Sequence, residues 1–390
     1  MKILNVIMSL DPVKGGGGVE RTYQLSKSLI KAGHQCSVLT TDLGLTKERI
    51  ASMNGVQVIA LQCLNKRFYF PKFSYKEIRE IIEDSDIVHF IGHWTLLNAI
   101  VFKAVQSLKK PYCVCPAGSL RIYGRNKFLK LAYNFLIGRK MIRSASAHIG
   151  ISVNEIEQFK EYGVSPQKVS IIPNGINPEE LNSRDIYYFR NKLGIGNSPF
   201  ILFVGRLNRI KGPDLLLKAF YNIKNNLQDF HLGFVGPDDG MLSELKQMVD
   251  EYQLNDRIHF IGYLGGADKS NAYHAADLLV IPSRQEAMSI VVLEAGISGT
   301  PVLLTDQCGF NVIEKIDGGK VVQPSVKGIE LGLIEILRDK DRLNCMGSNL
   351  KQYTNENFKW DSIIGKYLTL FDQILDVTEP KNIYRNSFKK

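Results

Sequence analysis

Two acidic residues, Glu286 and Glu294, are the strongest candidates for chemistry in the second half of the chain. Glu286 follows an apolar run that ends at Pro282, and Glu294 lies in the helix-like segment that comes next. Carboxylates at the carboxyl edge of a parallel sheet can hold sugar hydroxyls, and backbone amides at a helix start suit an anionic group. Spacing alone leaves a second interpretation open, in which Glu286 is a loop charge and Glu294 is a satisfied helix acid.

Two cations precede these acids. Arg206 and Lys211 come after the strand-like run PFILFVGRL and before a helix that opens with Pro213 and Asp214. In that position they can clamp a diphosphate and stabilise the charge that develops on a leaving nucleotide. Solvated surface charges are the alternative.

A glycine-rich loop, GGGGVE at residues 15–20, follows the first apolar run. Such a loop lets backbone amides approach a phosphate. It lacks the G-x-G-x-x-G pattern with a distant acid and the Gly-Lys-Ser/Thr ending of a P-loop, so NAD and ATP sites both fit poorly.

The elements that must position these residues alternate between strand and helix, and this pattern runs through the first half and then restarts near residue 200. The alternation predicts an α/β protein with two Rossmann-like, doubly wound parallel-sheet domains. We predict an N-terminal domain over 1–183, a linker over 184–199, a second domain over 200–358, a helix over 359–376 and a basic tail over 377–390.

Several of these segments, in this order, resemble the retaining glycosyltransferases of family 4, which have the GT-B fold. They are GGGGVERTYQLSKSLIKAGHQCSVLTT, IPNGIN, GRLNRIKGPDLLLKAF, VGPDDG and the Glu-x7-Glu segment. The likeness covers most of the chain. It implies two domains that face a cleft, acceptor binding by the first, nucleotide-sugar binding by the second, and a C-terminal helix that crosses back to the first.

The resemblance also implies a role for each site residue. Arg206 and Lys211 would bind the donor diphosphate, Glu286 the donor-sugar hydroxyls, and Glu294 the ribose. The remaining donor-binding positions would be the glycines Gly16 and Gly17 beside the phosphate, the backbone of Ala287, Met288, Ser289 and Ile290, and Gly236 and Tyr263 near the base.

The implied reaction moves a hexose or N-acetylhexosamine from a UDP- or GDP-sugar to a saccharide or lipid-linked acceptor, in bacterial cell-surface polysaccharide assembly. The leaving phosphate would accept the acceptor's proton, so neither a cofactor nor a metal is expected. Two alternatives remain: a catalytically silent, membrane-recruited partner protein, and a sugar-nucleotide epimerase.

One position departs from the family. Many relatives carry a histidine within Pro-His-Gly in the first domain, where this chain has Pro116, Ala117 and Gly118. His93, at the end of an earlier strand, is a candidate catalytic group on the acceptor side. A structural histidine satisfied by the backbone is the alternative.

Charge is concentrated in the first half of the chain. Residues 1–198 carry 27 Lys and Arg against 15 Asp and Glu, and residues 199–390 carry 22 against 24. The segment RIYGRNKFLKLAYNFLIGRKMIR, residues 121–143, interleaves cations with bulky apolar residues and suggests a helix on an anionic membrane. A helix with one buried apolar face is the alternative. No nucleic-acid motif occurs.

The apolar start, MKILNVIMSLDP, lacks a small-residue cleavage site and is typical of a buried first strand, so we expect a cytoplasmic protein. The basic segment adds the expectation of peripheral attachment to the inner face of the cell membrane. No run of eighteen apolar residues occurs. The six cysteines fit no zinc pattern, and we expect them to be reduced.

Overall fold

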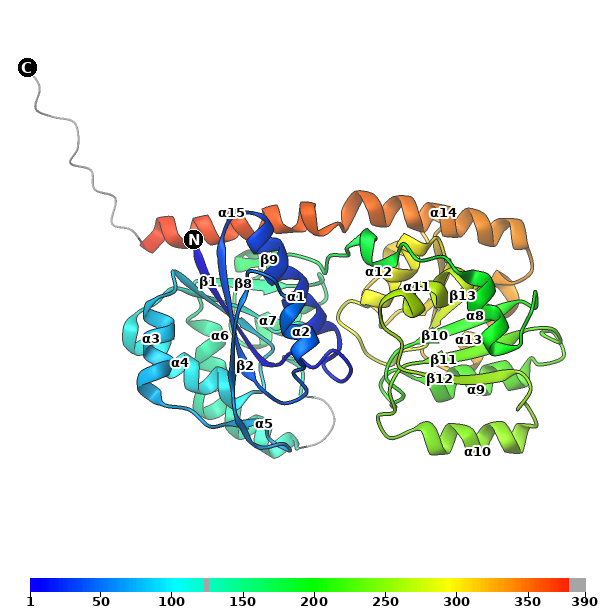
Figure 1. Cartoon of the computed structure of the whole chain (residues 1–390), viewed down its shortest axis with the longest axis horizontal. Coiled ribbons are helices and arrows are strands. Elements are labelled where there is room, and N and C mark those ends of the chain that lie inside the picture. The colour runs from blue at the N-terminus through cyan, green and yellow to red at the C-terminus, as the bar shows by residue number, and fades with distance from the viewer. Residues whose placement is uncertain (123–125, 379–390) are drawn as a thin grey trace, which may run out of the picture. The chain divides into compact units, whose positions relative to one another are not determined.

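The computed structural model describes residues 1–122 and 126–378, and the chain divides into two compact units. Unit 1 comprises Met1–Ile172 and Ile363–Lys390, and unit 2 comprises Pro173–Ser362. In each unit helices cover both faces of one sheet (Figure 1). The predicted fold class, two Rossmann-like α/β units with the GT-B arrangement of elements, is confirmed.

The sheet of unit 1 has seven strands in the order β3-β2-β1-β6-β7-β8-β9. All the strand pairs in it are parallel. The strands are β1 (Lys2–Ser9), β2 (Gln35–Thr41), β3 (Gln57–Leu61), β6 (Ile87–Ile91), β7 (Tyr112–Cys115), β8 (Ala147–Gly150) and β9 (Val169–Ile171), and a separate antiparallel hairpin joins β4 (Cys63–Asn65) to β5 (Phe70–Pro71). Every residue of β6 is buried, as expected for a central parallel strand.

The helices of unit 1 connect these parallel strands. They are α1 (Gly16–Lys31), α2 (Lys47–Ala51), α3 (Tyr75–Glu83), α4 (Leu96–Leu108), α5 (Lys127–Tyr133), α6 (Arg139–Arg143) and α7 (Glu155–Glu161), and a π-helical segment, Asn134–Gly138, joins α5 to α6. Side chains cap several of them: Ser74 accepts from the Glu77 amide at the start of α3, and Thr95 accepts from the Asn98 amide at the start of α4. Such caps satisfy amides that a helix start leaves unpaired.

The C-terminal helix α15 (Trp360–Thr378) belongs to unit 1 from Ile363 onward. Tyr367 and Phe371 are fully buried there, and both rings pack near the imidazole of His89 on β6. Burial of two aromatic side chains on the first unit explains why the last helix of the sequence is part of the first domain.

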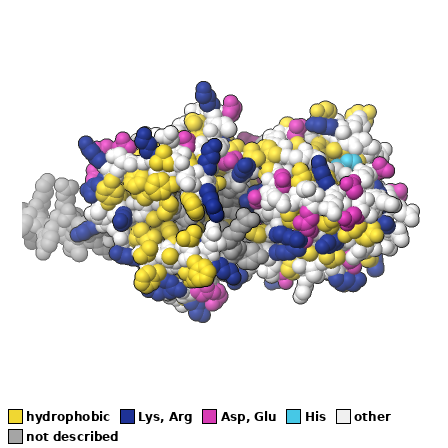
Figure 2. Space-filling view, turned by 90° about the horizontal axis from the view of Figure 1, so that it is seen from below, with side chains coloured by type: hydrophobic (Ala, Val, Ile, Leu, Met, Phe, Trp, Pro, Cys, Tyr) yellow, Lys and Arg dark blue, Asp and Glu magenta, His cyan; other side chains and the backbone are white. Residues whose placement is uncertain are grey.

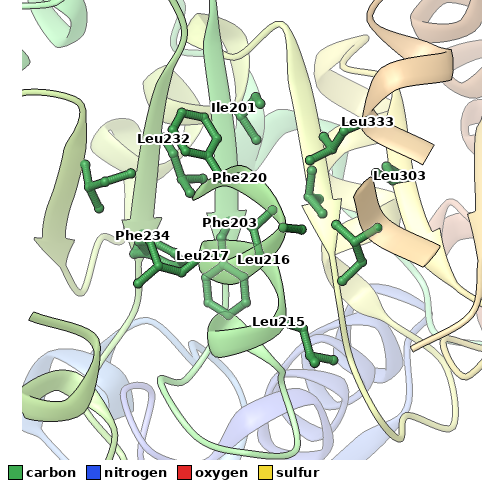
Figure 3. Close-up of a cluster of buried hydrophobic side chains, with 14 of the residues drawn as sticks. Ile201, Phe203, Leu215, Leu216, Leu217, Phe220, Leu232, Phe234, Leu303 and Leu333 are labelled. Atoms are coloured by element: carbon green, nitrogen blue, oxygen red, sulfur yellow. The ribbon is translucent and has the colours of Figure 1, made fainter. Parts of the chain in front are cut away.

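The sheet of unit 2 has six strands in the order β12-β11-β10-β13-β14-β15, again all parallel. They are β10 (Phe200–Val204), β11 (His231–Val235), β12 (Ile258–Gly262), β13 (Leu278–Ile281), β14 (Val302–Thr305) and β15 (Gly319–Val322). One apolar cluster joins strands β10, β11 and β14 to helices α9 (Pro213–Asn222) and α13 (Val326–Ile336). Phe203, Phe220 and Leu333 are among its buried members (Figure 3).

The helices of unit 2 are α8 (Ile186–Leu193), α9 (Pro213–Asn222), α10 (Leu242–Tyr252), α11 (Gly266–Ala275), α12 (Ile290–Ser298), α13 (Val326–Ile336) and α14 (Lys340–Asn357). Helix α9 opens with proline, whose fixed φ and missing amide suit the first helical position. Helix α12 is buried along most of its length, which matches its apolar sequence.

The division between the units differs from the predicted one. The segment 184–199, expected to be a linker, contains α8 and lies within unit 2. Asp185 caps α8 through the Tyr188 amide, and the Phe189 ring is buried. Arg190 donates to the Ala275 carbonyl at 2.6 Å and pairs with Asp277 at 3.2 Å. Polar composition here reflects a short surface helix with one buried face.

Within the residues that the structure describes, no helix is long and apolar enough to cross a membrane. The six cysteines are free; Cys36, Cys113, Cys115 and Cys308 are buried. Burial raises the pKa of the Cys115 thiol to about 11, so this group is a protonated core residue at neutral pH.

Candidate active site

The candidate residues of unit 2 gather where its strand order reverses. Strands β10 and β13 are neighbours in the sheet, but β10 connects onward through β11 and β13 through β14. Open α/β sheets bind ligands at the carboxyl ends of such a strand pair, because the two outgoing loops diverge there. Arg206 and Lys211 lie in the loop after β10, and Glu286 lies in the loop after β13.

Lys211 and Glu286 meet directly. The Lys211 ammonium lies 2.6 Å from a Glu286 carboxylate oxygen, and the Ser283 hydroxyl donates to the same oxygen at 2.6 Å. The carboxylate is largely buried, with 9% of its side chain exposed, while 26% of the Lys211 side chain is exposed. Burial would raise the pKa of Glu286, but Lys211 and its hydrogen bonds outweigh burial and lower it. The site therefore holds an ionised acid beside a cation.

Arg206 lies at the rim of the same loop. Its guanidinium pairs with Asp239 at 3.1 Å, and the Asn208 amide donates to the same Asp239 oxygen at 2.7 Å. About two fifths of the Arg206 side chain is exposed. Because an exposed ion pair of this kind is weak, an incoming anion can compete with Asp239 for the guanidinium at small cost.

An ion pair between the buried Asp214 and the partly exposed Arg284, which the sequence analysis did not identify, joins the two loops. The Arg284 guanidinium binds both oxygens of Asp214, at 2.8 and 2.7 Å, and also donates to the Arg209 carbonyl at 2.6 Å. The Arg284 amide donates to the Ile210 carbonyl at 2.7 Å. Asp214 is 2% exposed, and the neighbouring arginines lower its pKa against the effect of burial. The pair fixes the Lys211 loop against the loop that carries Glu286.

Glu294 lies inside α12 and is also paired. Its carboxylate accepts from the Lys269 ammonium at 2.8 Å and from the Tyr273 hydroxyl at 2.5 Å, both from α11. Only 8% of its side chain is exposed. A ribose that bound this carboxylate would meet an acid already oriented by two donors. The ribose-binding role of Glu294 stays a prediction.

The segment Ala287, Met288, Ser289 and Ile290 leads from the Glu286 loop into α12. No side chain caps the N-terminus of this helix, and its first turn contains no acid. The Glu286 carboxylate lies nearby, since it interacts with Ser289 at the N-cap position. The Asn174 side chain donates to the Met288 carbonyl at 3.3 Å and the Asn174 amide contacts the Met288 sulfur, which holds the turn in place.

Gly236 and Tyr263 lie at the carboxyl ends of β11 and β12. Gly236 has φ +143°, and a Cβ atom there would lie 1.9 Å from the Gly205 carbonyl oxygen. Its amide donates to the Gly262 carbonyl at 2.8 Å. Glycine is therefore required for packing between strand ends. The Tyr263 ring is 47% exposed at the same edge, as a ring that stacks on a base would need.

In unit 1 the glycine loop follows β1, and His93 follows β6. These two strands are neighbours where the order of the first sheet reverses. Gly16 and Gly17 form the first turn of α1 and are exposed, and no side chain caps that helix. Gly16 has φ +66° with open space around it, which leaves its backbone accessible to a phosphate.

His93 is 1% exposed and lies among aromatic rings. One ring nitrogen lies 2.9 Å from the Asn134 side-chain oxygen, and the rings of Trp94, Tyr133 and Tyr162 pack against the imidazole edge to face. Burial lowers the pKa of His93 to about 4, so the imidazole is neutral at pH 7. These contacts hold the π-helical segment to β6. A part for His93 in turnover stays a prediction.

Ala117, at the position of the family histidine, has φ +50°, a backbone conformation that a residue with a Cβ rarely adopts. The buried Glu155 carboxylate accepts from the Gly118 and Ile151 amides, each at 2.6 Å. Burial raises the pKa of Glu155, and these amides act against it. The loop is thus held in a strained form by one buried acid that the sequence did not single out.

In the described part of the chain no group of three or more His, Cys, Asp or Glu is placed to hold a metal ion.

Comparisons with known proteins cover both units. Residues 186–353 match the family described as glycosyl transferases group 1, and residues 15–180 match glycosyltransferase family 4. An uncharacterized glycosyltransferase of Methanocaldococcus jannaschii is 25% identical over 392 residues, covering 95% of this chain and 98% of the relative. The N-acetyl-alpha-D-glucosaminyl L-malate synthase of Bacillus anthracis is 24% identical over 385 residues, covering 95% and 97%.

Among solved structures, the Anabaena protein HepE in complex with UDP and glucose is similar to this chain with a TM-score of 0.79. The two sequences are 19% identical, and the similarity covers 96% of this chain and 100% of that chain. At this identity the likeness shows that the two proteins share a fold.

Proposed function

This chain belongs to glycosyltransferase family 4, and from that premise we propose that it transfers a hexose or N-acetylhexosamine from a nucleotide-diphosphate sugar to a saccharide or lipid-linked acceptor. The observation that carries the proposal is the contact of 2.6 Å between Lys211 and Glu286 at the carboxyl edge of the unit 2 sheet. This contact supports the proposal because the cation would bind phosphate and the adjacent acid would hold sugar hydroxyls.

The donor diphosphate would bind Lys211 and Arg206 in place of their present carboxylate partners. Both cations already pair with carboxylates, Glu286 and Asp239, so the anion would exchange one ion pair for another without ordering a new side chain. Lys211 released in this way frees one oxygen of Glu286 for a hydroxyl of the donor sugar. The uncapped start of α12 adds backbone amides for the phosphate.

We propose a retaining reaction without a metal. Positive charge at the site would stabilise the leaving diphosphate, and the acceptor hydroxyl would attack from the face that the diphosphate leaves, giving its proton to a phosphate oxygen. Orientation and electrostatics then supply the rate, with no acid–base residue of the protein required.

UDP is the donor nucleotide that the similarity to HepE favours, since that structure holds UDP and glucose; GDP is the alternative. We place the reaction at the cytoplasmic side of the membrane, in the assembly of a bacterial cell-surface polysaccharide. The basic surface of unit 1 supports this placement, because it suits an anionic lipid and an acceptor carried on lipid.

Nucleotide binding is tested first by thermal unfolding with UDP, GDP, ADP, their common sugars and NAD. A ligand that binds only the folded protein stabilises it by about 2.7 kcal/mol at a hundredfold excess over its dissociation constant. We expect one nucleoside diphosphate and its sugars to raise the midpoint and NAD to leave it unchanged. A panel with no response would favour the silent partner protein.

Turnover is tested by Lys211→Ala and Glu286→Gln, each of which should lower kcat/KM about 100- to 1,000-fold by removing charge stabilisation or sugar orientation. Lys246→Ala, an exposed lysine on α10, is the matched control and should have no effect. Sugar transfer is followed together with epimerisation of the donor in the absence of acceptor. Epimerisation without transfer, or full activity in both variants, would refute the proposal.

A further inference from the structure

Two segments of unit 1 expose apolar side chains that a folded domain normally buries. On α5 and the π-helical segment, Phe128 is 87%, Phe135 88% and Leu136 75% exposed, and Leu129 and Leu131 are more than half exposed. Asn134 of the same stretch is buried instead. The stretch therefore buries the polar Asn134 and leaves five bulky apolar side chains exposed, whereas a surface helix that packs on a core normally buries such side chains.

The outward apolar residues are held in place. Asn134 contacts His93 at 2.9 Å and donates to the Tyr162 hydroxyl at 2.7 Å, and the Tyr133 hydroxyl contacts the Thr95 carbonyl at 3.3 Å. Gly138 is needed beside them, because a Cβ there would lie 2.5 Å from the Asn134 oxygen. A π-helical segment shifts the register of a helix face, and such segments are frequent at functional sites.

The β4–β5 hairpin is the second segment. Leu64, Phe68 and Phe70 are 58%, 46% and 39% exposed, and Phe73 and Tyr75 just after it are 37% and 43% exposed. No periodic pattern in the sequence had suggested a surface here.

Both segments adjoin α4 or the residues just before it. Strand β5 contacts α4, and the ammonium of Lys130 on α5 lies 5.6 Å from the ring centre of Trp94, two residues before that helix. Leu96, the first residue of α4, is itself 39% exposed. Seen from below, unit 1 presents a broad area of hydrophobic side chains, with Lys and Arg and some Asp and Glu at its margins (Figure 2).

The charge of the two segments has one sign. Residues 62–76 and 121–143 contain Lys and Arg but neither Asp nor Glu, and no acid occurs anywhere between Asp86 and Glu155. Exposed cations among the described residues of these segments include Lys66, Arg67, Lys72, Lys127, Arg139 and Lys140. Arg125, part of the predicted basic helix, lies outside the described residues.

We infer that the α5–π-helical segment and the β4–β5 hairpin together form a docking surface for an anionic lipid bilayer. Apolar side chains that enter the acyl boundary, surrounded by cations that meet lipid phosphates, are the two contributions that interfacial binding needs. A second copy of the chain would bring like charges face to face across this surface. The surface exposes leucines as well as phenylalanines, and such aliphatic side chains suit an acyl interior better than the stacked bases of a nucleic acid, so a bilayer is the better match.

This inference deepens the proposed function, since it names the surface from which a lipid-linked acceptor would be reached. Vesicle binding is measured without any sugar transfer. A failure of the docking surface can therefore be distinguished from a failure of the proposed glycosyl transfer.

The experiment is co-sedimentation of the full chain with phosphatidylcholine vesicles and with vesicles that also contain phosphatidylglycerol. We expect binding to the anionic vesicles, weakened by salt and nearly absent without the anionic lipid. Phe135→Ser with Leu136→Ser, and separately Phe68→Ser with Phe70→Ser, should each reduce binding at least tenfold. Lys127→Glu with Lys140→Glu should reduce it by about fivefold or more for each cation.

Leu331→Ser, on exposed Leu331 of α13, is the matched control and should bind as the unchanged protein does. All the substituted side chains are exposed, so the thermal midpoints should stay within a few degrees and confirm folding. Fluorescence gives an independent readout, since only Trp94 and Trp360 are present and Trp94 lies beside the surface. Lipids brominated on their acyl chains should quench Trp94, and Trp94→Phe should abolish that quenching.

No binding to anionic vesicles, or equal loss in the Leu331 control, would overturn the inference. A change of oligomeric state in the Phe135 and Leu136 variant, seen by sedimentation without vesicles, would assign the surface to a second copy of the chain instead.

Discussion

Among individual residues of unit 2, the buried Asp214 and the partly exposed Arg284 form an ion pair that joins the two loops of the candidate site. Asp214→Asn removes the partner of Arg284 and should lower the free energy of unfolding by about 3 kcal/mol at pH 7. The pKa of Asp214 is lowered from 3.8, so its contribution is complete above that pH and is lost as the pH falls below it. Urea unfolding at pH 7 and pH 3 should show a smaller difference between variant and unchanged protein at pH 3. Asp256→Asn, exposed in unit 2, serves as control.

His93 supplies a second prediction at the residue scale. Its pKa is lowered from 6.5 to about 4 by burial, so the folded protein binds fewer protons than the unfolded chain between these values. Its contribution is therefore present above pH 6.5 and is lost as the pH falls toward 4, by about 3 kcal/mol. His93→Gln keeps a donor for Asn134 and should reduce this loss. Unfolding curves measured from pH 7 to pH 4 test this prediction. If the free energy of unfolding depends on pH equally in the variant and in the unchanged protein, the pKa of His93 is not lowered.

At the scale of elements, the loop before α9 depends on Gly212. This residue has φ +71°, and a Cβ would lie 2.1 Å from the Pro282 carbonyl oxygen at the end of β13. Gly212→Ala should lower the free energy of unfolding by about 1–3 kcal/mol and weaken nucleotide binding, because the neighbouring Lys211 moves. Gly194→Ala has nearly the same φ, +68°, with open space, and isolates the backbone cost alone. If chemical denaturation gave equal losses of unfolding free energy in both variants, the contact between a Cβ at position 212 and the Pro282 carbonyl would have no effect on stability.

At the scale of the whole molecule, Arg21 joins two distant parts of unit 1. The buried guanidinium donates to the Ile172 carbonyl, where the first pass of the chain through this unit ends, and to the Tyr367 hydroxyl on α15, where the chain has returned. Tyr367→Phe removes one hydrogen-bond partner of this buried guanidinium and should lower the free energy of unfolding by about 1–3 kcal/mol. Hydrogen exchange should quicken in α1 and β6 but not in α9. Faster exchange in both units alike would contradict the separation of the two cores.

The sequence by itself determined the parts of this protein that depend on local pattern. Alternating apolar runs and amphipathic stretches predicted two parallel-sheet units, and the order of motifs predicted the family. Arg206, Lys211 and Glu286 were identified because they follow strands, and strand ends are where α/β sheets bind ligands.

Only the tertiary structure decided which side chains meet and which way they face. The bracing of the Lys211 loop by Asp214 and Arg284 joins residues 70 positions apart, and no local pattern marks such a pair. Polar composition at residues 184–199 suited a linker and a capped surface helix equally well, and burial of Phe189 decided between them. The basic segment likewise has the composition of a packed helix, but the structure buries Asn134 and leaves Phe128, Phe135 and Leu136 exposed. The periodicity of an element can be read from the local sequence. Which face of that element is buried depends on contacts with residues that are distant along the chain.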